Sequence, residues 1–336
     1  MYTDHYGLTA PPFQLTPDPR FWFESATHKK AMAYLGYGLA QGEGFIVVTG
    51  DIGAGKTTLV AHLMDTLDPM RVVAVKIVST QVEGDDMLRM AAQAFGLPTE
   101  GVEKAQLLDR IERYLIDTGR GGRRTLLIVD EAQNLPTSSI EELRMLSNFQ
   151  SGGHALLQIF LLGQPEFRDR LNSAPALEQM RQRVIATHHL DPMQPHETLP
   201  YLEHRLKLAG WSGNPRITDD AASALHTVSG GIPRKINTLA TRALLMGALD
   251  AADTIDGSMI WHVAADAEGE RPASPERPEA ALSPSAPAGR VIDHEARLAM
   301  LETQMQEQEA ALRRVLTLLV DWIEREDSVM GRARSA

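Results

Sequence analysis

The sequence predicts an α/β fold with a parallel sheet, followed by a small all-helical domain. Four short apolar runs rich in β-branched residues indicate strands, at residues 45–48, 72–78, 126–129 and 156–162. Each run is almost continuously apolar, as expected for strands covered on both faces, and segments of helix length separate the runs. This alternation is typical of a parallel sheet. A fifth run at residues 184–190 is a weaker strand, because His188 and His189 interrupt it.

The composition is that of an ordinary globular chain. Its 336 residues are 43% hydrophobic, 23% charged and 5% aromatic, which is enough for about two compact domains. The absence of cysteine excludes a disulfide framework, a thiolate nucleophile and a cysteine-ligated zinc site, and it suits a reducing cytoplasm. The formal net charge of −11 disfavours nucleic acid as the main partner, although a local basic patch could still bind it.

The beginning of the chain lacks the features of a targeting segment. No basic stretch is followed by an apolar one, and nowhere do about 18 apolar residues run together. We therefore expect no export signal and no membrane span. The expected location is the cytoplasm, with any contact to the inner membrane peripheral and made through a partner.

From residue 191 onward, signals for helix starts and stops dominate the sequence. Leucines recur at helix spacing at positions 199, 202 and 206, and Gly230 with Gly231 would stop a later helix. A further helix beginning near Asp256 would bury Ile260 and Val263. These signals predict an all-helical domain over residues 191–265.

Two segments of different character follow this domain. Residues 266–290 contain five prolines among alanine, serine and glutamate, so we expect a disordered linker. In residues 291–326 apolar side chains recur every seven positions, which predicts a coiled-coil-like helix that self-associates over residues 291–322 or binds a partner helix. Packing on the rest of the chain and contact with a membrane surface are the alternatives. Residues 327–336 form a tail.

A phosphate-binding motif follows the first predicted strand. The segment matches G-x-x-x-x-G-K-[ST] and opens a predicted helix; it comprises Gly50, Asp51, Ile52, Gly53, Ala54, Gly55, Lys56, Thr57 and Thr58. Glycines allow consecutive backbone N–H groups to turn inward and surround a phosphate. Lys56 would bind the β- and γ-phosphates of ATP, and the Thr57 hydroxyl would bind Mg²⁺. Thr58 is either a contact for the α-phosphate or a helix residue without such a role.

Two carboxylates end the third predicted strand. Asp130 and Glu131 would emerge at the carboxyl edge of the sheet, where open α/β sheets bind ligands. Asp130 would hold Mg²⁺ through water, while Glu131 would orient and deprotonate the attacking water. An acidic pair after a strand is unspecific alone, but the phosphate-binding motif upstream favours this interpretation.

Four further residues are candidates for sensing the γ-phosphate and stabilising developing charge. Gln164 follows the fourth strand, where it could contact the attacking water or simply cap a turn. Arg181 and Arg183 precede the fifth strand and could reach the γ-phosphate of a neighbouring subunit, or belong to a solvated basic turn. Arg234 begins a helix after a proline and could swing over the phosphates, or be a surface arginine.

Taken in order, these residues resemble the AAA+ ATPases. They resemble more narrowly the ExeA, or general secretion pathway A, type, which includes ATPases associated with exosortase and exopolysaccharide loci. The resemblance covers roughly residues 1–265. Besides residues 50–58, its distinctive parts are Tyr6-Gly7-Leu8, Pro12-Phe13, Thr16-Pro17-Asp18-Pro19, Ser25 with His28, Asp130-Glu131-Ala132-Gln133, residues 143–149, Gly163-Gln164-Pro165 and Gly231-Ile232-Pro233-Arg234.

The resemblance implies a P-loop core over residues 1–190, with a sheet in the order 5-1-4-3-2 and an N-terminal segment beside the adenine pocket. It implies a helical lid over 191–265, with nucleotide between lid and core. By similarity Arg234 is the lid sensor, Gln164 is the core sensor, and Arg181 or Arg183 acts in trans. Subunits would associate through the AAA+ interface.

The function expected from these features is hydrolysis of ATP to ADP and phosphate, which drives a conformational change in a protein partner. Secretion and exopolysaccharide or envelope assembly are the processes that the resemblance implies. The alternative is a DNA-binding ATPase of the transposition-target-selector or origin-loader type, which the acidic balance of the chain disfavours. A third alternative is a nucleotide-gated scaffold with little turnover.

Overall fold

A computed structural model describes residues 2–16, 18–78 and 83–269 of the chain. The coiled-coil-like helix expected over 291–326, the tail at 327–336 and most of the expected 266–290 linker lie outside the described residues.

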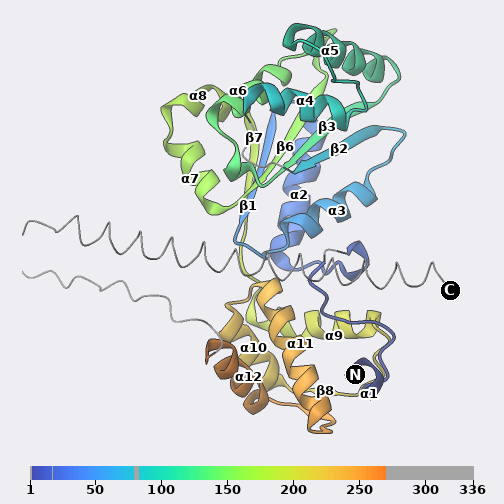
Figure 1. Cartoon of the computed structure of the whole chain (residues 1–336), viewed down its shortest axis with the longest axis vertical. Helices are drawn as coiled ribbons and strands as arrows, with labels where there is room; N and C mark the ends of the chain where they lie inside the picture. Colours follow the sequence, from blue (N-terminus) through green and yellow to red (C-terminus); the bar gives the residue numbers. More distant parts are fainter. Residues whose placement is uncertain (1, 17, 79–82, 270–336) are drawn as a thin grey trace, which may run out of the picture. The chain divides into compact units, whose positions relative to one another are not determined.

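A five-stranded parallel sheet forms the centre of the core (Figure 1). Its strand order is β2-β3-β6-β1-β7, which is the expected 5-1-4-3-2 order seen from the other edge. The strands are β1 (Phe45–Gly50), β2 (Val72–Val78), β3 (Arg124–Asp130), β6 (Leu157–Gly163) and β7 (Val184–Leu190). All neighbouring pairs are parallel, which confirms the predicted fold class.

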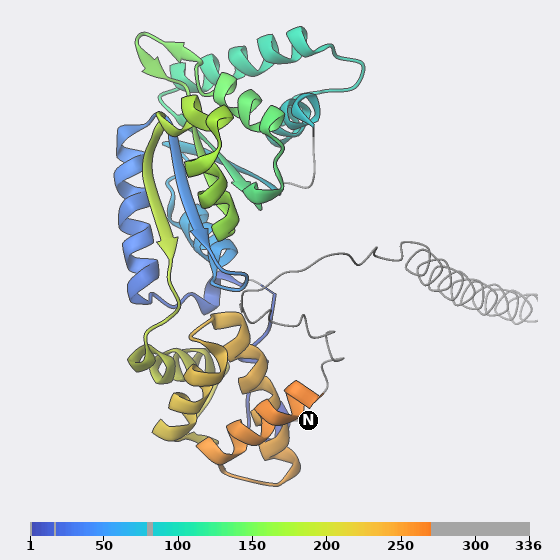
Figure 2. The same cartoon turned by 90° about the vertical axis from the view of Figure 1, so that its left-hand side faces the viewer.

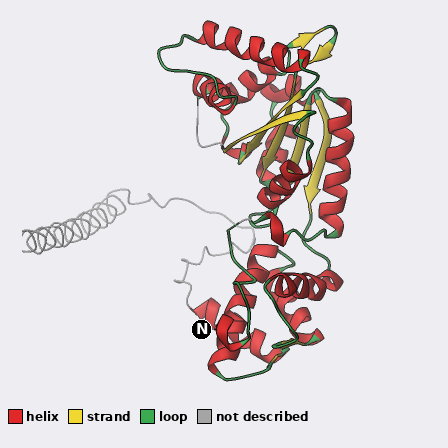
Figure 3. Cartoon of the chain, turned by 90° about the vertical axis from the view of Figure 1, so that its right-hand side faces the viewer, coloured by secondary structure: helices red, strands yellow, loops and turns green. Residues whose placement is uncertain are grey.

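Helices cover both faces of the sheet, so the strands lie between two layers of helices (Figures 2 and 3). Successive residues of a strand point to opposite faces, so Phe45 and Val47 of β1 pack on one side and Ile46 and Val48 on the other. The first face packs against α4 (Gly84–Ala94), α5 (Lys104–Arg120), α6 (Thr137–Leu146) and α7 (Pro165–Ser173). The second face packs against α2 (Ala26–Gln41) and α3 (Lys56–Thr66). Burial on both sides explains the continuous apolar runs.

A helical unit follows β7. Its helices are α9 (Thr198–Leu208), α10 (Asp219–Ser229), α11 (Pro233–Leu249) and α12 (Gly257–Gly269). The Thr218 side chain accepts a hydrogen bond from the Ala221 N–H at the start of α10, and Gly230 ends that helix in the left-handed region (φ 62°). Ile260 and Val263 are buried in α12, as expected. This helix runs to Gly269, past the expected boundary at residue 265.

The N-terminal segment packs on the helical unit. Tyr6, Leu8 and Phe13 belong to the same hydrophobic cluster as the side chains of α9, α10 and α11. The Tyr6 hydroxyl donates to the Ala252 carbonyl (3.0 Å), and the Thr9 N–H donates to the Ala209 carbonyl (2.8 Å). From the resemblance, these residues were expected within the 1–190 core, as part of an N-terminal segment beside the adenine pocket. Their apolar side chains instead complete the core of the lid.

Short elements that the sequence pattern did not predict connect the larger ones. They are α1 (Tyr2–His5), η1 (Pro19–Phe21), η2 (Ala132–Asn134), the hairpin of β4 (Gln150–Ser151) and β5 (His154–Ala155), η3 (Pro175–Leu177), α8 (Glu178–Arg181), η4 (Pro195–Glu197), and the paired strands β8 (Arg216–Ile217) and β9 (Thr254–Ile255).

Candidate functional site

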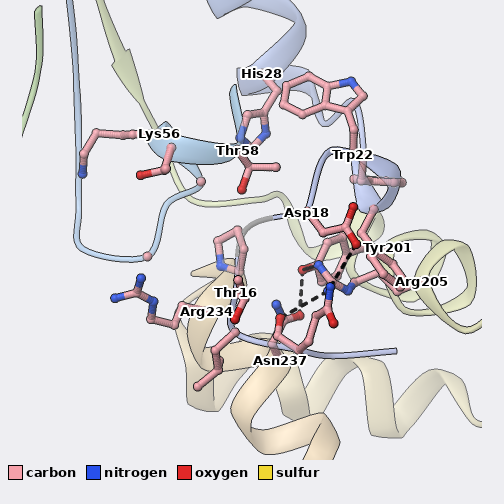
Figure 4. A pocket seen from close by; sticks show the side chains of 18 of the residues that line it. Thr16, Asp18, Trp22, His28, Lys56, Thr58, Tyr201, Arg205, Arg234 and Asn237 are labelled. Carbon is pink, nitrogen blue, oxygen red and sulfur yellow. Dashed lines mark hydrogen bonds between the residues drawn. The ribbon is translucent and has the colours of Figure 1, made fainter. Parts of the chain in front are cut away.

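A pocket lies at the carboxyl end of β1, between the P-loop, the N-terminal segment and the helical unit. Figure 4 shows Lys56 and Thr58 on one side of this pocket and Tyr201, Arg234 and Asn237 on the other. The core contributes Ile52, Gly53, Gly55, Lys56, Thr57, Thr58, Glu131 and Gln164, and residues 14–28 contribute Gln14, Leu15, Thr16, Asp18, Phe21, Trp22, Phe23 and His28. The helical unit and the segment leading to it contribute Met193, Tyr201, Arg205, Pro233, Arg234 and Asn237.

The P-loop backbone requires glycine at two positions. Gly53 and Gly55 have positive φ values of 88° and 97°, which L side chains rarely adopt. A Cβ at Gly53 would also lie 2.5 Å from Cβ of Arg234, and a Cβ at Gly55 would lie 2.8 Å from Nε2 of His28. The loop is therefore closely packed by the lid on one side and by α2 on the other.

Lys56 begins α3 with its side chain buried, at 7% exposure. Its Nζ donates to the carbonyls of Gly50 (2.7 Å) and Asp51 (3.0 Å). Burial lowers the pKa of Lys56 from its ordinary value, and the nearby carboxylates of Glu131, Asp130 and Asp51 act in the opposite direction. A phosphate would thus meet an ammonium already within the loop.

Thr57 and Asp130 lie next to each other as expected for a divalent cation site. The Thr57 hydroxyl donates to Oδ2 of Asp130 (3.3 Å), and Asp130 is only 3% exposed. One hydroxyl and one carboxylate fit Mg²⁺, which usually takes its other ligands from water and substrate phosphates. Thr57 and Asp130 are thus the residues that would hold Mg²⁺. The same Oδ2 also accepts from Nζ of Lys76 in β2 (2.8 Å).

Glu131 follows Asp130 in the left-handed backbone region, with φ 57°. Such a conformation costs energy for a non-glycine residue and is often found at functional sites. Its Oε2 accepts a hydrogen bond from Nε2 of Gln133 (2.5 Å), and Oε1 of Gln133 accepts from the N–H of Gln164 (3.0 Å). Gln164 also precedes α7 as its N-cap residue. The structure thus brings Glu131 and Gln164 together.

Arg234 of the lid contacts the P-loop directly. It follows Pro233 in the first turn of α11, and its backbone N–H donates to the Gly53 carbonyl (3.2 Å). Its side chain lines the pocket from the side of the helical unit, facing the P-loop residues Lys56 and Thr58 (Figure 4). The expected lid residue is therefore within the site.

Arg181 and Arg183 do not line this pocket. They precede β7, at the opposite end of the strand from the P-loop edge. Arg181 donates to the carbonyls of Leu171 (3.0 Å) and Asn172 (2.5 Å) and is paired with Glu178. Arg183 donates to the Ser147 hydroxyl (3.2 Å). The structure does not bring either arginine to the phosphate site of its own chain.

Aromatic and histidine side chains from the N-terminal segment form a wall of the pocket. The Trp22 ring stacks on His62 of α3, with centroids 4.2 Å apart, and meets His28 edge-on at 5.1 Å. His28 is buried, its Nδ1 lies 2.7 Å from the Ser25 hydroxyl, and burial lowers its pKa to about 4. Sequence reasoning named Ser25 and His28 only as parts of the resemblance. No spacing signal connects Trp22 to His62.

Arg205 of α9 joins the N-terminal segment to the helical unit. Its guanidinium is buried, donates to the Pro12 carbonyl (2.7 Å) and lies over the Phe21 ring, 4.7 Å from the centroid. It also donates to the Tyr201 hydroxyl (3.3 Å), which donates in turn to Oδ1 of Asn237 (2.7 Å). Sequence reasoning missed this network, because its members lie far apart in the chain.

Comparison with known proteins agrees with this geometry. Residues 39–171 match the family described as AAA domain. The fold and the phosphate site are those of an AAA+ P-loop ATPase, a class that binds nucleotide. Within this class the chain is similar to the general secretion pathway A, or ExeA, type. It is 38% identical over 246 residues to General secretion pathway protein A of Aeromonas hydrophila, a match that covers 73% of this chain and 44% of that relative. It thus spans less than half of the relative's length.

Solved structures share the fold at low sequence identity. The Aeropyrum pernix ORC2 protein, in ADPNP–ADP complexes, aligns with a TM-score of 0.56 at 15% identity over 76% of this chain and 71% of that chain. Cdc6p of Pyrobaculum aerophilum aligns with a TM-score of 0.59 at 14% identity over 73% and 67% of the two chains. At these identities the likeness concerns the fold alone.

Among the described residues, no helix is both long enough and apolar enough to span a bilayer.

Proposed function

We propose that this protein hydrolyses ATP to ADP and phosphate with Mg²⁺ and uses the cycle to change the conformation of a protein partner. The observation that carries the proposal is the convergence of Lys56, Glu131 and Arg234 on one pocket. These side chains come from the P-loop, from the end of β3 and from the lid. Their convergence supplies a phosphate-binding cation, a base and a second cation from a separate unit.

Each residue has a chemical role in this proposal. Lys56 exchanges the Gly50 and Asp51 carbonyls for the β- and γ-phosphates. Thr57 and Asp130 would hold Mg²⁺, which supplies positive charge to the phosphates when bound. Glu131 orients the attacking water and accepts its proton, and Gln164 contacts that water. Arg234 stabilises the charge that develops on the phosphate oxygens.

Contact between the lid and the P-loop would couple ATP hydrolysis to movement of the lid. The Arg234 N–H bonds the Gly53 carbonyl, so a change of the P-loop on hydrolysis is transmitted to the start of α11. Residues 2–13 pack in the lid core and would move with it. Nucleotide state would thereby set the position of both segments.

Self-association completes the proposed site. A trans-acting arginine must lie outside the pocket of its own subunit, and Arg181 and Arg183 satisfy this condition. Either would reach the γ-phosphate of a neighbour in an assembly formed through the AAA+ interface. Residues 291–322 would provide additional self-association.

The partner is proposed to be a protein of an envelope export system or of exopolysaccharide assembly. The likeness to General secretion pathway protein A supports secretion as the process. We propose a cytoplasmic location, with attachment to the inner membrane through that partner.

Two substitutions test the proposal directly. Lys56→Ala is expected to abolish binding of a fluorescent ATP analogue, while Glu131→Gln retains binding and lowers turnover at least about 100-fold. Lys29→Ala and Glu43→Gln, at exposed side chains, are the controls. Turnover of either site variant at the rate of the unchanged protein would contradict the proposal. ATP-responsive, salt-dependent binding of duplex DNA would replace the protein partner with DNA.

A further inference from the structure

Gln133 forms a bridge between two residues of the proposed site. Its Nε2 donates to Oε2 of Glu131 (2.5 Å), and its Oε1 accepts from the backbone N–H of Gln164 (3.0 Å). We propose that Gln133 is a positioning residue that holds the Glu131 carboxylate in place for water activation and couples it to the loop carrying Gln164. This inference rests on the proposed ATP hydrolysis.

The chemistry of the two partners fixes the orientation of the Gln133 amide. An ionised carboxylate only accepts hydrogen bonds, and a backbone N–H only donates them. Turning the amide over would place its oxygen against the Glu131 carboxylate and its NH₂ group against the Gln164 N–H. The amide of glutamine is therefore matched at both ends, and neither a carboxylate nor a thioether can make both bonds.

The backbone that carries Gln133 is itself held in place. Arg170 of α7 donates to the carbonyls of Gln133 (3.3 Å) and Leu135 (2.8 Å). The Asn134 N–H donates to the Glu131 carbonyl (3.0 Å), which closes the short η2 turn. A fixed backbone lowers the entropy that the Gln133 side chain loses when it bridges its partners.

The hydrogen bond from Gln133 restricts rotation of the Glu131 side chain. Glu131 is half-buried at the pocket wall, so its carboxylate can rotate unless it is bound. Hydrogen bonds to a charged group are shorter and stronger than those between neutral groups. Binding one carboxylate oxygen leaves the other to accept the proton of the attacking water.

The bridge also links the ends of two neighbouring strands. Glu131 follows β3 and Gln164 follows β6, and these strands pair directly in the sheet. A shift of the Gln164 backbone on contact with the γ-phosphate would be transmitted through a single amide to the base. Loss of the amide should therefore slow chemistry and leave nucleotide binding, which depends on the P-loop, intact.

The test compares kcat with binding in the full-length chain. Gln133→Met keeps the approximate length and removes both bonds, and Gln133→Asn keeps the amide but shortens it by one methylene. Each is expected to lower kcat for ATP about tenfold or more, with KM and the Kd of a fluorescent ADP analogue changed less than about twofold. Gln93→Met is the matched control, because Gln93 donates to Thr99 (3.0 Å) outside the residues that line the pocket.

A double substitution tests whether Gln133 acts through Glu131. In the Glu131→Gln background, Gln133→Met is expected to cause no further loss of the residual rate. The inference is overturned if Gln133→Met and Gln133→Asn retain or raise kcat, if they lower nucleotide affinity as much as kcat, or if the losses multiply with Glu131→Gln. If the proposed function itself is wrong, the unchanged protein shows no ATP turnover that depends on Glu131, which distinguishes this outcome from failure of the inference about Gln133.

Discussion

Lys76 and Asp130 form an ion pair at the place where the divalent cation is expected. The Nζ to Oδ2 distance is 2.8 Å, and the side chains are 23% and 5% exposed. The ammonium of Lys76 thus neutralises the buried carboxylate from the neighbouring strand β2. Mg²⁺ and Lys76 would compete for the Asp130 carboxylate.

Lys76→Met should therefore lower the free energy of unfolding mainly when Mg²⁺ is absent. Without Mg²⁺ the variant leaves the buried Asp130 carboxylate without its ion-pair partner, so we expect a loss of about 2 kcal/mol in unfolding free energy. Saturating Mg-ADP should restore most of this loss. Urea unfolding in EDTA and in Mg-ADP measures both values, with Lys29→Met as the control. Equal stability of Lys76→Met and the unchanged protein in EDTA would contradict the prediction.

Arg234→Ala should impair turnover through loss of a lid cation. If Arg234 stabilises charge in the transition state, its removal lowers kcat by about 100-fold. Lys235→Ala removes the same charge from the next, exposed position of α11 and should leave kcat nearly unchanged. Steady-state ATPase assays of the two variants make the comparison. Equal losses would assign the effect to the net charge of the lid.

Burial of His28 should make stability depend on pH. Its pKa falls from 6.5 to about 4 in the folded chain, so below pH 6.5 the unfolded state binds the proton first. The contribution of His28 to the free energy of unfolding is constant above pH 6.5 and declines by about 3 kcal/mol as the pH falls to 4. Urea unfolding of His28→Gln across this range should show a correspondingly flatter pH dependence. His262→Gln, at an exposed position of α12, should keep the original slope.

Mixed assemblies should identify the arginine that acts in trans. The variant lacking it should lose turnover by about 1,000-fold and regain part of it with Lys56→Ala subunits, which supply the arginine but bind no nucleotide. Arg183→Ala is the simpler test, because Arg181 also holds the carbonyls of Leu171 and Asn172. No recovery in mixtures with either Arg181→Ala or Arg183→Ala would exclude both residues.

The architecture of the core was predictable because burial on two faces leaves a strong signal. Residues 126–129 are apolar throughout and residues 156–162 are apolar except for Gln158, since their alternate side chains enter two separate hydrophobic clusters. The P-loop was equally predictable, because a tight backbone turn restricts the residue types at Gly53 and Gly55. Both signals are local in sequence.

Contacts between distant residues left no such signal. A lysine within a strand gave no reason to place Lys76 beside Asp130, because the pairing depends on strand register. The role of Gln133 depends on the Gln164 backbone, 31 residues away. Likewise, Arg205 meets the Pro12 carbonyl across 193 residues.

Because residues 2–13 pack against the lid, both ends of the described chain contribute to the lid. Tyr6 reaches Ala252, and α1 lies against α11. In the proposed nucleotide cycle, a pair of spectroscopic labels on α1 and α12 would therefore keep a constant separation, whereas a pair on α1 and α5 would test for movement of the helical unit relative to the sheet. Removing the first 13 residues would expose the apolar surface that Leu8 and Phe13 now cover, so a shortened protein would aggregate before its catalysis could be assessed.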